Sequence, residues 1–131
     1  MVSPMVFVEL IVVYAAHELA LAQEGGAQGL RDANILESAV NRARMRYSYS
    51  PQSTVAQLSA AYAYGLVRDH PFIDGNKRTA YLVAEAFCNL NDWRLDADDV
   101  ESIIIFRALA AGEIEEDGLA KWFGRHLKKT Q

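Results

Sequence analysis

The sequence has little of what marks disulfide-rich or nucleic-acid-binding proteins. Its only cysteine, Cys88, has no partner within the chain, which excludes an internal disulfide, and its apolar surroundings predict a small core residue. The formal net charge of −4 and the scatter of lysines and arginines leave no broad basic face for phosphate contacts. We therefore expect no direct nucleic-acid partner.

A hydrophobic run long enough to cross a membrane is also missing. The apolar stretch PMVFVELIVVYAA, residues 4–16, is interrupted by Glu9 and is shorter than the ~20 residues that span a bilayer. No lysine or arginine precedes it, as one would in a signal peptide. We expect a core helix here, in a cytoplasmic protein without membrane contact. The length of 131 residues fits a single domain, residues 1–131.

Capping residues and apolar spacing predict helices in the first half of the chain. Ser3–Pro4 can cap a helix that starts there or slightly later and ends at Gly25–Gly26. Asp32 can cap a second helix over residues 33–44, and Ser53–Thr54 can open a third. The expected inner faces of the second and third helices are Ile35, Leu36, Ala39, Val40 and Ala43, and Leu58, Ala61, Tyr62, Gly65 and Leu66, respectively.

Between these helices the pattern changes to alternation. In MRYSYS, residues 45–50, apolar or aromatic positions alternate with polar ones up to Pro51, which is typical of a short strand. One strand of this length is too little for a sheet.

Helical spacing returns in the second half. TAYLVAEAFCNLN, residues 79–91, is apolar almost all round, so we place this helix in the middle of a bundle. Asp98 and Glu101 resemble a capping box for a further helix that Gly112 closes. A last amphipathic helix carries Leu119, Trp122, Phe123 and Leu127. The expected fold is a compact all-α bundle with one short strand.

The stretch HPFIDGNKRTA, residues 70–80, is unlike the sequence around it. Gly75 and Asn76 tolerate left-handed backbone, so the chain can turn sharply before a helix begins. Such a turn leaves free backbone N–H groups at the positive end of the helix macrodipole, which is an anion site even without side chains. Lys77 and Arg78 follow in the first turn, where a bound anion would offset their repulsion by the dipole. The pattern indicates a phosphate site.

Two further side chains in this stretch suit phosphoryl or nucleotidyl transfer. Asp74 could hold Mg²⁺, which takes oxygen ligands and bridges carboxylates to nucleotide phosphates. His70 titrates near neutrality and could accept a proton from an attacking hydroxyl. Each residue alone also has an ordinary explanation, because loop histidines are commonly solvated and Asp-Gly-Asn is a common turn. The residues by themselves leave both alternatives open, a plain connecting loop and a phosphate site.

The same stretch resembles the signature of the Fic/Doc family, which runs His-Pro-Phe-x-Asp/Glu-Gly-Asn-Gly-Arg-x-x-Arg. Lys77 stands at the second glycine and Tyr81 at the last arginine, and both departures are features of the Doc (death-on-curing) branch. The flanking segments GLRDANILESAV and AYLVAEAFCNLNDWRLDADD are also similar to Doc-like proteins, so the resemblance covers residues 17–122. The matching positions are His70, Pro71, Phe72, Asp74, Gly75, Asn76 and Arg78.

This resemblance implies an all-α Fic fold and a toxin of a bacterial toxin–antitoxin pair, silenced in trans by a Phd-like antitoxin. Fic enzymes with glycine after the Asn transfer AMP from ATP to a target hydroxyl. In the Doc branch the lysine is taken to reseat the nucleotide, so that the enzyme is a protein kinase that uses the γ-phosphate. The implied target is a translation factor, with elongation factor Tu the leading candidate.

The resemblance also assigns roles, with ATP and Mg²⁺ as cofactors. His70 would be the base, Asp74 the Mg²⁺ ligand, Gly75 the point of close backbone approach, and Asn76, Lys77 and Arg78 the phosphate binders. Arg68 is a second-tier candidate that would face the same mouth if its helix frays. We expect Phe72 to anchor the loop and His17 to be a satisfied core histidine. Residues 45–50 would be either the flap that holds the target's extended segment or an ordinary connector.

Two rival functions remain, a Fic-type protein adenylyltransferase and a degenerate Fic domain that only binds. Lys77 discriminates kinase from adenylyltransferase, and the intact His70 and Asp74 argue against the binding module. Many Fic proteins inhibit themselves through a Ser/Thr-x-x-x-Glu helix whose glutamate pairs with the last motif arginine. No serine or threonine here is followed four residues later by glutamate, and Tyr81 replaces that arginine. An inhibitor in trans is therefore expected.

Overall fold

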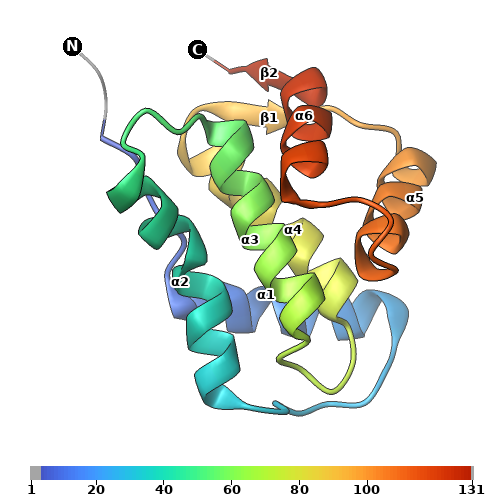
Figure 1. The fold of residues 1–131 in the computed structure, drawn as a ribbon. Helices are drawn as coiled ribbons and strands as arrows, with labels where there is room; N and C mark the ends of the chain where they lie inside the picture. The colour runs from blue at the N-terminus through green and yellow to red at the C-terminus, as the bar shows by residue number, and fades with distance from the viewer. Residues whose placement is uncertain (1–3, 131) are drawn as a thin grey trace.

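The computed structural model describes residues 4–130, in which six helices surround a common core and two short strands form one antiparallel sheet (Figure 1). This confirms a mainly helical class with a small strand component. In chain order the elements are α1 (Leu10–Glu24), α2 (Ala33–Tyr49), α3 (Val55–Asp69), α4 (Asn76–Leu90), β1 (Trp93–Leu95), α5 (Asp99–Ala110), α6 (Glu116–His126) and β2 (Leu127–Lys129). Among these residues no helix is long and apolar enough to cross a membrane.

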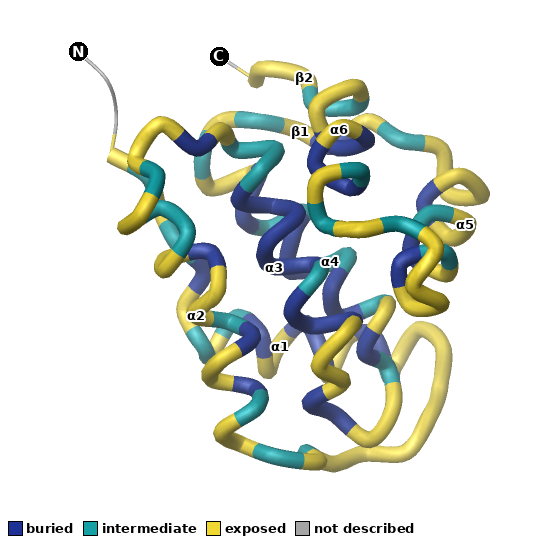
Figure 2. The backbone as a smooth tube through the Cα atoms, viewed as in Figure 1, coloured by how far each residue is buried: buried dark blue, intermediate teal, exposed yellow. Residues whose placement is uncertain are grey.

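Helix α3 lies at the centre, in contact with α2, α4, α5 and α6. All five residues of its predicted inner face are buried, and so are four more around its circumference (Figure 2). Small side chains make this possible. A Cβ at Gly65 would stand 2.9 Å from the Ala39 carbonyl oxygen, so only glycine allows α2 and α3 to approach this closely. Helix α4, expected in the middle, packs between α1 and α3 and is largely buried as well.

The first helix begins later than expected. Ser3 lies outside the described residues, and Pro4 belongs to an extended segment that precedes α1. The Asn91 side chain accepts from the Val6 N–H and donates to the Val6 carbonyl, and the Tyr62 hydroxyl accepts from the Val8 N–H. These partners lie more than fifty residues away in sequence, so local spacing could not reveal them. The predicted end at Gly25 is confirmed.

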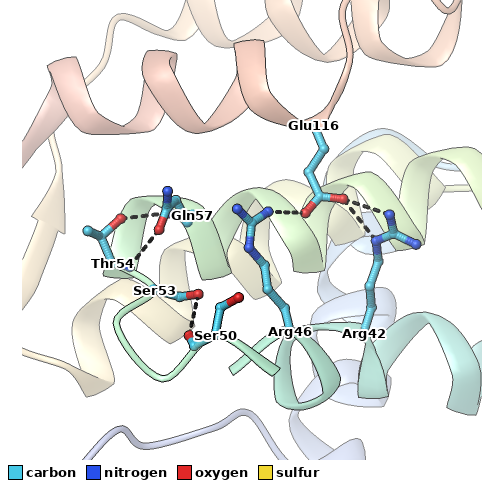
Figure 3. Close-up of polar contacts among 7 residues, drawn as sticks. All are labelled: Arg42, Arg46, Ser50, Ser53, Thr54, Gln57 and Glu116. Carbon is cyan, nitrogen blue, oxygen red and sulfur yellow. Dashed lines mark hydrogen bonds and ion pairs between the residues drawn. The ribbon is translucent and has the colours of Figure 1, made fainter. Parts of the chain in front are cut away.

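The strand predicted over residues 45–50 is wrong, because α2 continues to Tyr49. Glu116 at the start of α6 accepts from Arg42 at 2.7 Å and also pairs with Arg46, one helical turn further along α2 (Figure 3). The spacing i, i+4 of Ala39, Ala43 and Tyr47 continues the buried face of α2, and this helical signal outweighs the alternation. After Tyr49, a turn leads into a capping box between Thr54 and Gln57.

This correction also removes the flap interpretation of residues 45–50. The segment lies where α3 starts, whereas His70 follows the end of α3, and Figure 1 shows the two at opposite ends of the bundle. The 15 residues of α3 span about 22 Å at 1.5 Å per residue. The segment therefore cannot hold a target strand beside the histidine.

The strands of the structure lie elsewhere. β1 pairs with β2 in antiparallel register, with Trp93 opposite Lys129 and Leu95 opposite Leu127. The Lys129 ammonium stands over the Trp93 ring at 4.8 Å from its centroid. Each strand has only three residues, too few for alternation to be visible in the sequence.

The caps of α5 were predicted in part. Asp98 is the N-cap of α5, but its side chain makes no capping hydrogen bond. Glu101 accepts instead from the Trp122 indole N–H at 3.1 Å and lies 3.0 Å from His126 Nε2, which ties α5 to α6. Gly112 has a φ of +77° just beyond α5, as expected for a closing glycine.

Candidate active site

The motif loop, defined here as residues 70–75, is joined to the loop between α1 and α2. The Ile73 N–H donates to the Gly29 carbonyl at 3.0 Å, and Leu30 forms an antiparallel bridge with Phe72. Two successive N–H groups, of Arg31 and Asp32, donate to the Pro71 carbonyl at 2.7 and 3.3 Å. Both loops lie at one end of the bundle, away from the sheet (Figure 1). The motif loop therefore rests on a second loop that fixes its path.

Phe72 and His17 anchor this loop to the core. The Phe72 side chain is 1% exposed and stacks on the His17 ring at a centroid distance of 3.8 Å. His17 Nε2 hydrogen-bonds the Asp74 carbonyl oxygen at 2.9 Å. The expectations of a structural Phe72 and a satisfied core histidine at position 17 are both confirmed. The hydrogen bond from His17 on α1 also fixes the position of the Asp74 backbone, immediately before Gly75.

Gly75 and Asn76 form the turn into α4. Gly75 has a φ of +82°, and a Cβ there would meet Leu21 at 3.3 Å and His17 at 3.6 Å. The Asn76 side chain is buried and makes a reciprocal pair with Phe72, accepting from its N–H at 3.0 Å and donating to its carbonyl at 2.9 Å. The amide is therefore buried and held by the Phe72 backbone, and the group of Asn76 that we assign to a phosphate is its backbone N–H.

The start of α4 presents donors without partners. Within residues 4–130, no hydrogen bond uses the backbone N–H of Asn76, Lys77 or Arg78. Free N–H groups at a helix start, together with the macrodipole, favour an anion. The structure thus has a left-handed glycine turn followed by these unbonded backbone donors and two cations, in the order that the sequence predicts.

Lys77 and Arg78 line a pocket of about 420 Å³ between the end of α1, the start of α4 and α5. Lys77 is exposed. Arg78 donates through Nε to Gln23 Oε1 at 3.0 Å, and its guanidinium carbon stands 5.4 Å from the centre of the Tyr81 ring. The hydrogen bond uses Nε of the guanidinium, so its terminal nitrogens Nη1 and Nη2 remain for a ligand. The pocket is lined by Gln23, Glu24, Lys77, Arg78, Tyr81, Asp99, Ser102, Ile103, Phe106 and Arg107.

Two residues that follow the cations on α4 have raised pKa values: Tyr81, which lines the pocket beside Arg78, and Glu85, which is not among the lining residues. Burial raises the pKa of Tyr81, which the Ser102 hydroxyl partly opposes, so this side chain is a neutral phenol near pH 7. Burial also raises the pKa of Glu85, one turn further along α4, while Arg78 opposes the shift and Asp99 adds to it. Tyr81 therefore gives a ring to Arg78 but cannot replace the charge of a second arginine.

His70 is exposed and ends α3 in a left-handed conformation, with φ 54° and ψ 58°. It lies on the motif loop and is not among the residues that line the pocket. Two residues that the sequence reasoning did not select contact this region, Gln23 at Arg78 and Arg31 at the His70 carbonyl. Arg31 lies within the segment GLRD, whose turn residues and adjacent charges are the only local signal for it.

Asp74 is exposed, and its Oδ2 accepts from the Ala27 N–H at 2.7 Å. In the part of the chain that the structure describes, no three histidine, cysteine or acidic side chains gather as a metal site. A single carboxylate fits Mg²⁺ when nucleotide phosphates and water supply the other oxygens, as this cation requires. Asp74 fits that mode of binding, with one oxygen engaged by the loop and the other available.

Arg68 is turned away from the pocket. Its guanidinium lies 3.8 Å from Glu115 Oε2 and 5.4 Å from the centre of the Tyr64 ring. The structure therefore brings Lys77 and Arg78 together but does not add Arg68 to them.

Comparison with known proteins identifies the family of this chain. The family model described as Fic/DOC family matches residues 8–88, which include α1 and the whole motif loop. The chain is 29% identical over 107 residues to protein kinase doc of Escherichia phage P1, covering 81% of this chain and 83% of that protein. It is 36% identical over 75 residues to toxin Doc of Mycolicibacterium smegmatis, covering 56% of this chain and 58% of that protein. The family match spans more than half of the sequence, and the chain belongs to the Fic/DOC family.

Proposed function

We propose that this protein is a Doc-type toxin that acts as an ATP-dependent protein kinase. The observation that carries the proposal is the exposed Lys77, which lines the pocket with Arg78 in the first turn of α4, where within residues 4–130 the first backbone N–H groups have no partner. General Fic signatures have glycine at position 77, which leaves room for phosphate against the backbone. A lysine fills that room with a fixed charge. The two similar proteins named protein kinase doc and toxin Doc support the same choice.

In this proposal the transfer uses residues of the motif loop and of the first turn of α4. His70 accepts the proton of the target hydroxyl, whose oxygen forms a bond to the γ-phosphorus of ATP as the bond to the β–γ bridging oxygen breaks. The products are the phosphorylated target and ADP. Asp74 would hold Mg²⁺, which supplies charge neutralisation between the phosphates when bound. Lys77, Arg78 and the backbone N–H groups of Gly75 and Asn76 hold the phosphates.

The proposed target is a hydroxyl of a translation factor, with elongation factor Tu the first to test. The proposed partner in the resting cell is a Phd-like antitoxin. The chain has no Ser/Thr-x-x-x-Glu segment and has Tyr81 at the last motif arginine, so self-inhibition by that route lacks both partners. Inhibition in trans by a segment that folds on binding fits such an enzyme.

The test separates the two transfer reactions. The protein is incubated with Mg²⁺, elongation factor Tu and ATP labelled either at the α or at the γ position. We expect the γ label alone on the target, and no label with His70→Ala. Transfer of the α label would replace the kinase with an adenylyltransferase. If the protein bound ATP but transferred neither label to any component of a translation extract, the remaining hypothesis would be a degenerate Fic domain that only binds.

A further inference from the structure

Arg31 makes three hydrogen bonds to the backbone around His70. Its Nε donates to the His70 carbonyl at 2.7 Å, and its Nη2 donates to the Asp69 carbonyl at 2.7 Å. Its own backbone N–H donates to the Pro71 carbonyl at 2.7 Å. One residue of the α1–α2 loop thus binds three consecutive carbonyl groups, those of residues 69, 70 and 71.

The middle residue of these three is strained. His70 is one of two non-glycine residues with positive φ in the described chain, at φ 54° and ψ 58°. Left-handed helix caps are usually glycine, because a Cβ in this region costs about 1–2 kcal/mol. Such strain persists only where the surroundings over-determine it, and it is concentrated at functional sites.

The end of α3 also explains why an arginine suits this position. The last carbonyls of a helix have no partner within the helix, and they carry the negative end of its macrodipole. A guanidinium is planar and offers several donors in a fixed fork, so it can bind two neighbouring carbonyls at once. Lysine offers a point charge without that fork, and this difference makes the role of Arg31 testable.

We propose that Arg31 is a positioning residue for His70. Its fork holds the Asp69 and His70 carbonyls and keeps His70 in the left-handed conformation, which aims the imidazole at the hydroxyl to be phosphorylated. Arg31 touches neither nucleotide nor target in this role. The inference rests on the proposed function only for the use of His70 as the base, since the backbone geometry stands independently.

The kinetic test compares Arg31→Lys and Arg31→Ala with the wild type, and uses Arg94→Ala as a control. Arg94 is exposed on β1, at the opposite end of the bundle (Figure 1), and its substitution by alanine removes the same charge as Arg31→Ala. We expect kcat to fall ~100-fold in both Arg31 variants, while KM for ATP changes by less than ~3-fold, because misplacing a catalytic group by about 1 Å has effects of this size. Methylguanidinium should restore part of the rate of Arg31→Ala and none of that of His70→Ala. A lysine variant with wild-type kcat would overturn the proposal, since charge alone would then suffice.

The spectroscopic test does not need activity. The Cα and amide chemical shifts of His70 report a positive φ, and they should move toward extended or right-handed values in both Arg31 variants, with little change at Gly75. Unchanged His70 shifts in Arg31→Lys and Arg31→Ala would contradict the inference. If the wild type transfers no phosphate, the proposed function fails, but the chemical shifts still decide the role of Arg31. Should Arg31→Ala not fold, Arg31→Lys and Arg31→Gln provide the same comparison.

Discussion

Two pairs of cations in this protein are placed in opposite ways. Arg42 and Arg46 lie on the second half of α2, and both bind Glu116, whose side chain is only 16% exposed (Figure 3). Lys77 and Arg78 lie in the first turn of α4, and within residues 4–130 neither has an ion pair. The helix dipole favours cations near a C-terminus and disfavours them near an N-terminus. The first pair stabilises the fold, whereas the second is kept at a cost that a bound phosphate would offset.

The largest effect should come from His70, the proposed base on the motif loop before α4. We expect His70→Ala to lower transfer to the target by ~10²–10⁴-fold, the usual contribution of a general base. ATP binding, measured by titration calorimetry with Mg²⁺, should stay within ~3-fold, because His70 does not line the pocket. Expression of this variant should no longer slow bacterial growth. A comparable loss of ATP affinity would show that His70 holds the nucleotide instead.

The next effect concerns the identity of the transferred group. Lys77→Gly restores the general Fic signature at this position, and we expect it to lower γ-phosphate transfer by ~10²-fold, as loss of a single charge-stabilising donor does elsewhere. The variant should also gain some transfer of the α label. Lys121→Gly, exposed on α6, serves as the matched control. If Lys77→Gly keeps full γ-transfer and shows no α-transfer, Lys77 does not set the orientation of ATP.

The sequence predicted most of the helices and the whole motif loop, because both depend on local signals. Caps such as Asp32 and Thr54, and the glycines that end helices, act within one turn of the chain. The errors arise where distant partners decide the structure. Glu116 helps to keep residues 45–49 helical, and Asn91 holds Val6 extended. Neither partner is visible in a short window of sequence.

The site shows the same division between local and distant information. The left-handed turn at Gly75 before α4 follows from neighbouring residues, and the structure has it where the sequence predicts it. Arg31 and Gln23 contact His70 and Arg78, which lie 39 and 55 residues away in sequence, so local sequence does not reveal these contacts. The sequence predicts Asn76 as a phosphate binder but not the hydrogen bonds of its side-chain amide to Phe72, which depend on how the loop folds back.

Stability should separate the two pairs of cations. Glu116→Gln leaves Arg42 and Arg46 without their carboxylate, and we expect the free energy of unfolding to fall by about 1–2 kcal/mol, less than for a fully buried pair. Lys77→Ala removes a cation from a helix start and should raise it by about 0.3–1 kcal/mol. Urea titrations of both variants in nucleotide-free buffer provide the measurement. If Glu116→Gln were more stable than the wild type and Lys77→Ala less stable, Lys77 and Arg78 would be the structural pair, and Arg42 and Arg46 the pair available for a ligand.

The smallest expected effect is a pH dependence at Glu85, which lies one turn after Tyr81 on α4. Burial raises its pKa in the folded protein above the ordinary value of 4.5, while Arg78 opposes the shift and Asp99 adds to it. At pH values below 4.5 both the folded and the unfolded chain hold the proton, and the side chain has no effect on stability. As the pH rises, the unfolded chain releases its proton first, so the folded state becomes less stable by comparison.

Glu85→Gln has no proton to release, and it should therefore be more stable than the wild type near pH 7. The difference should shrink steadily as the pH is lowered toward 4.5. Because the carboxyl is about half buried, solvent screening keeps this effect small. Glu113→Gln, an exposed change of the same kind just beyond α5, provides the control and should show no such trend. Urea unfolding at several pH values tests this, and a difference that grew on acidification would mean that Arg78 pairs with Glu85 more strongly than burial opposes it. In that case Arg78 would have a carboxylate of its own, and the contrast between the two pairs of cations would weaken.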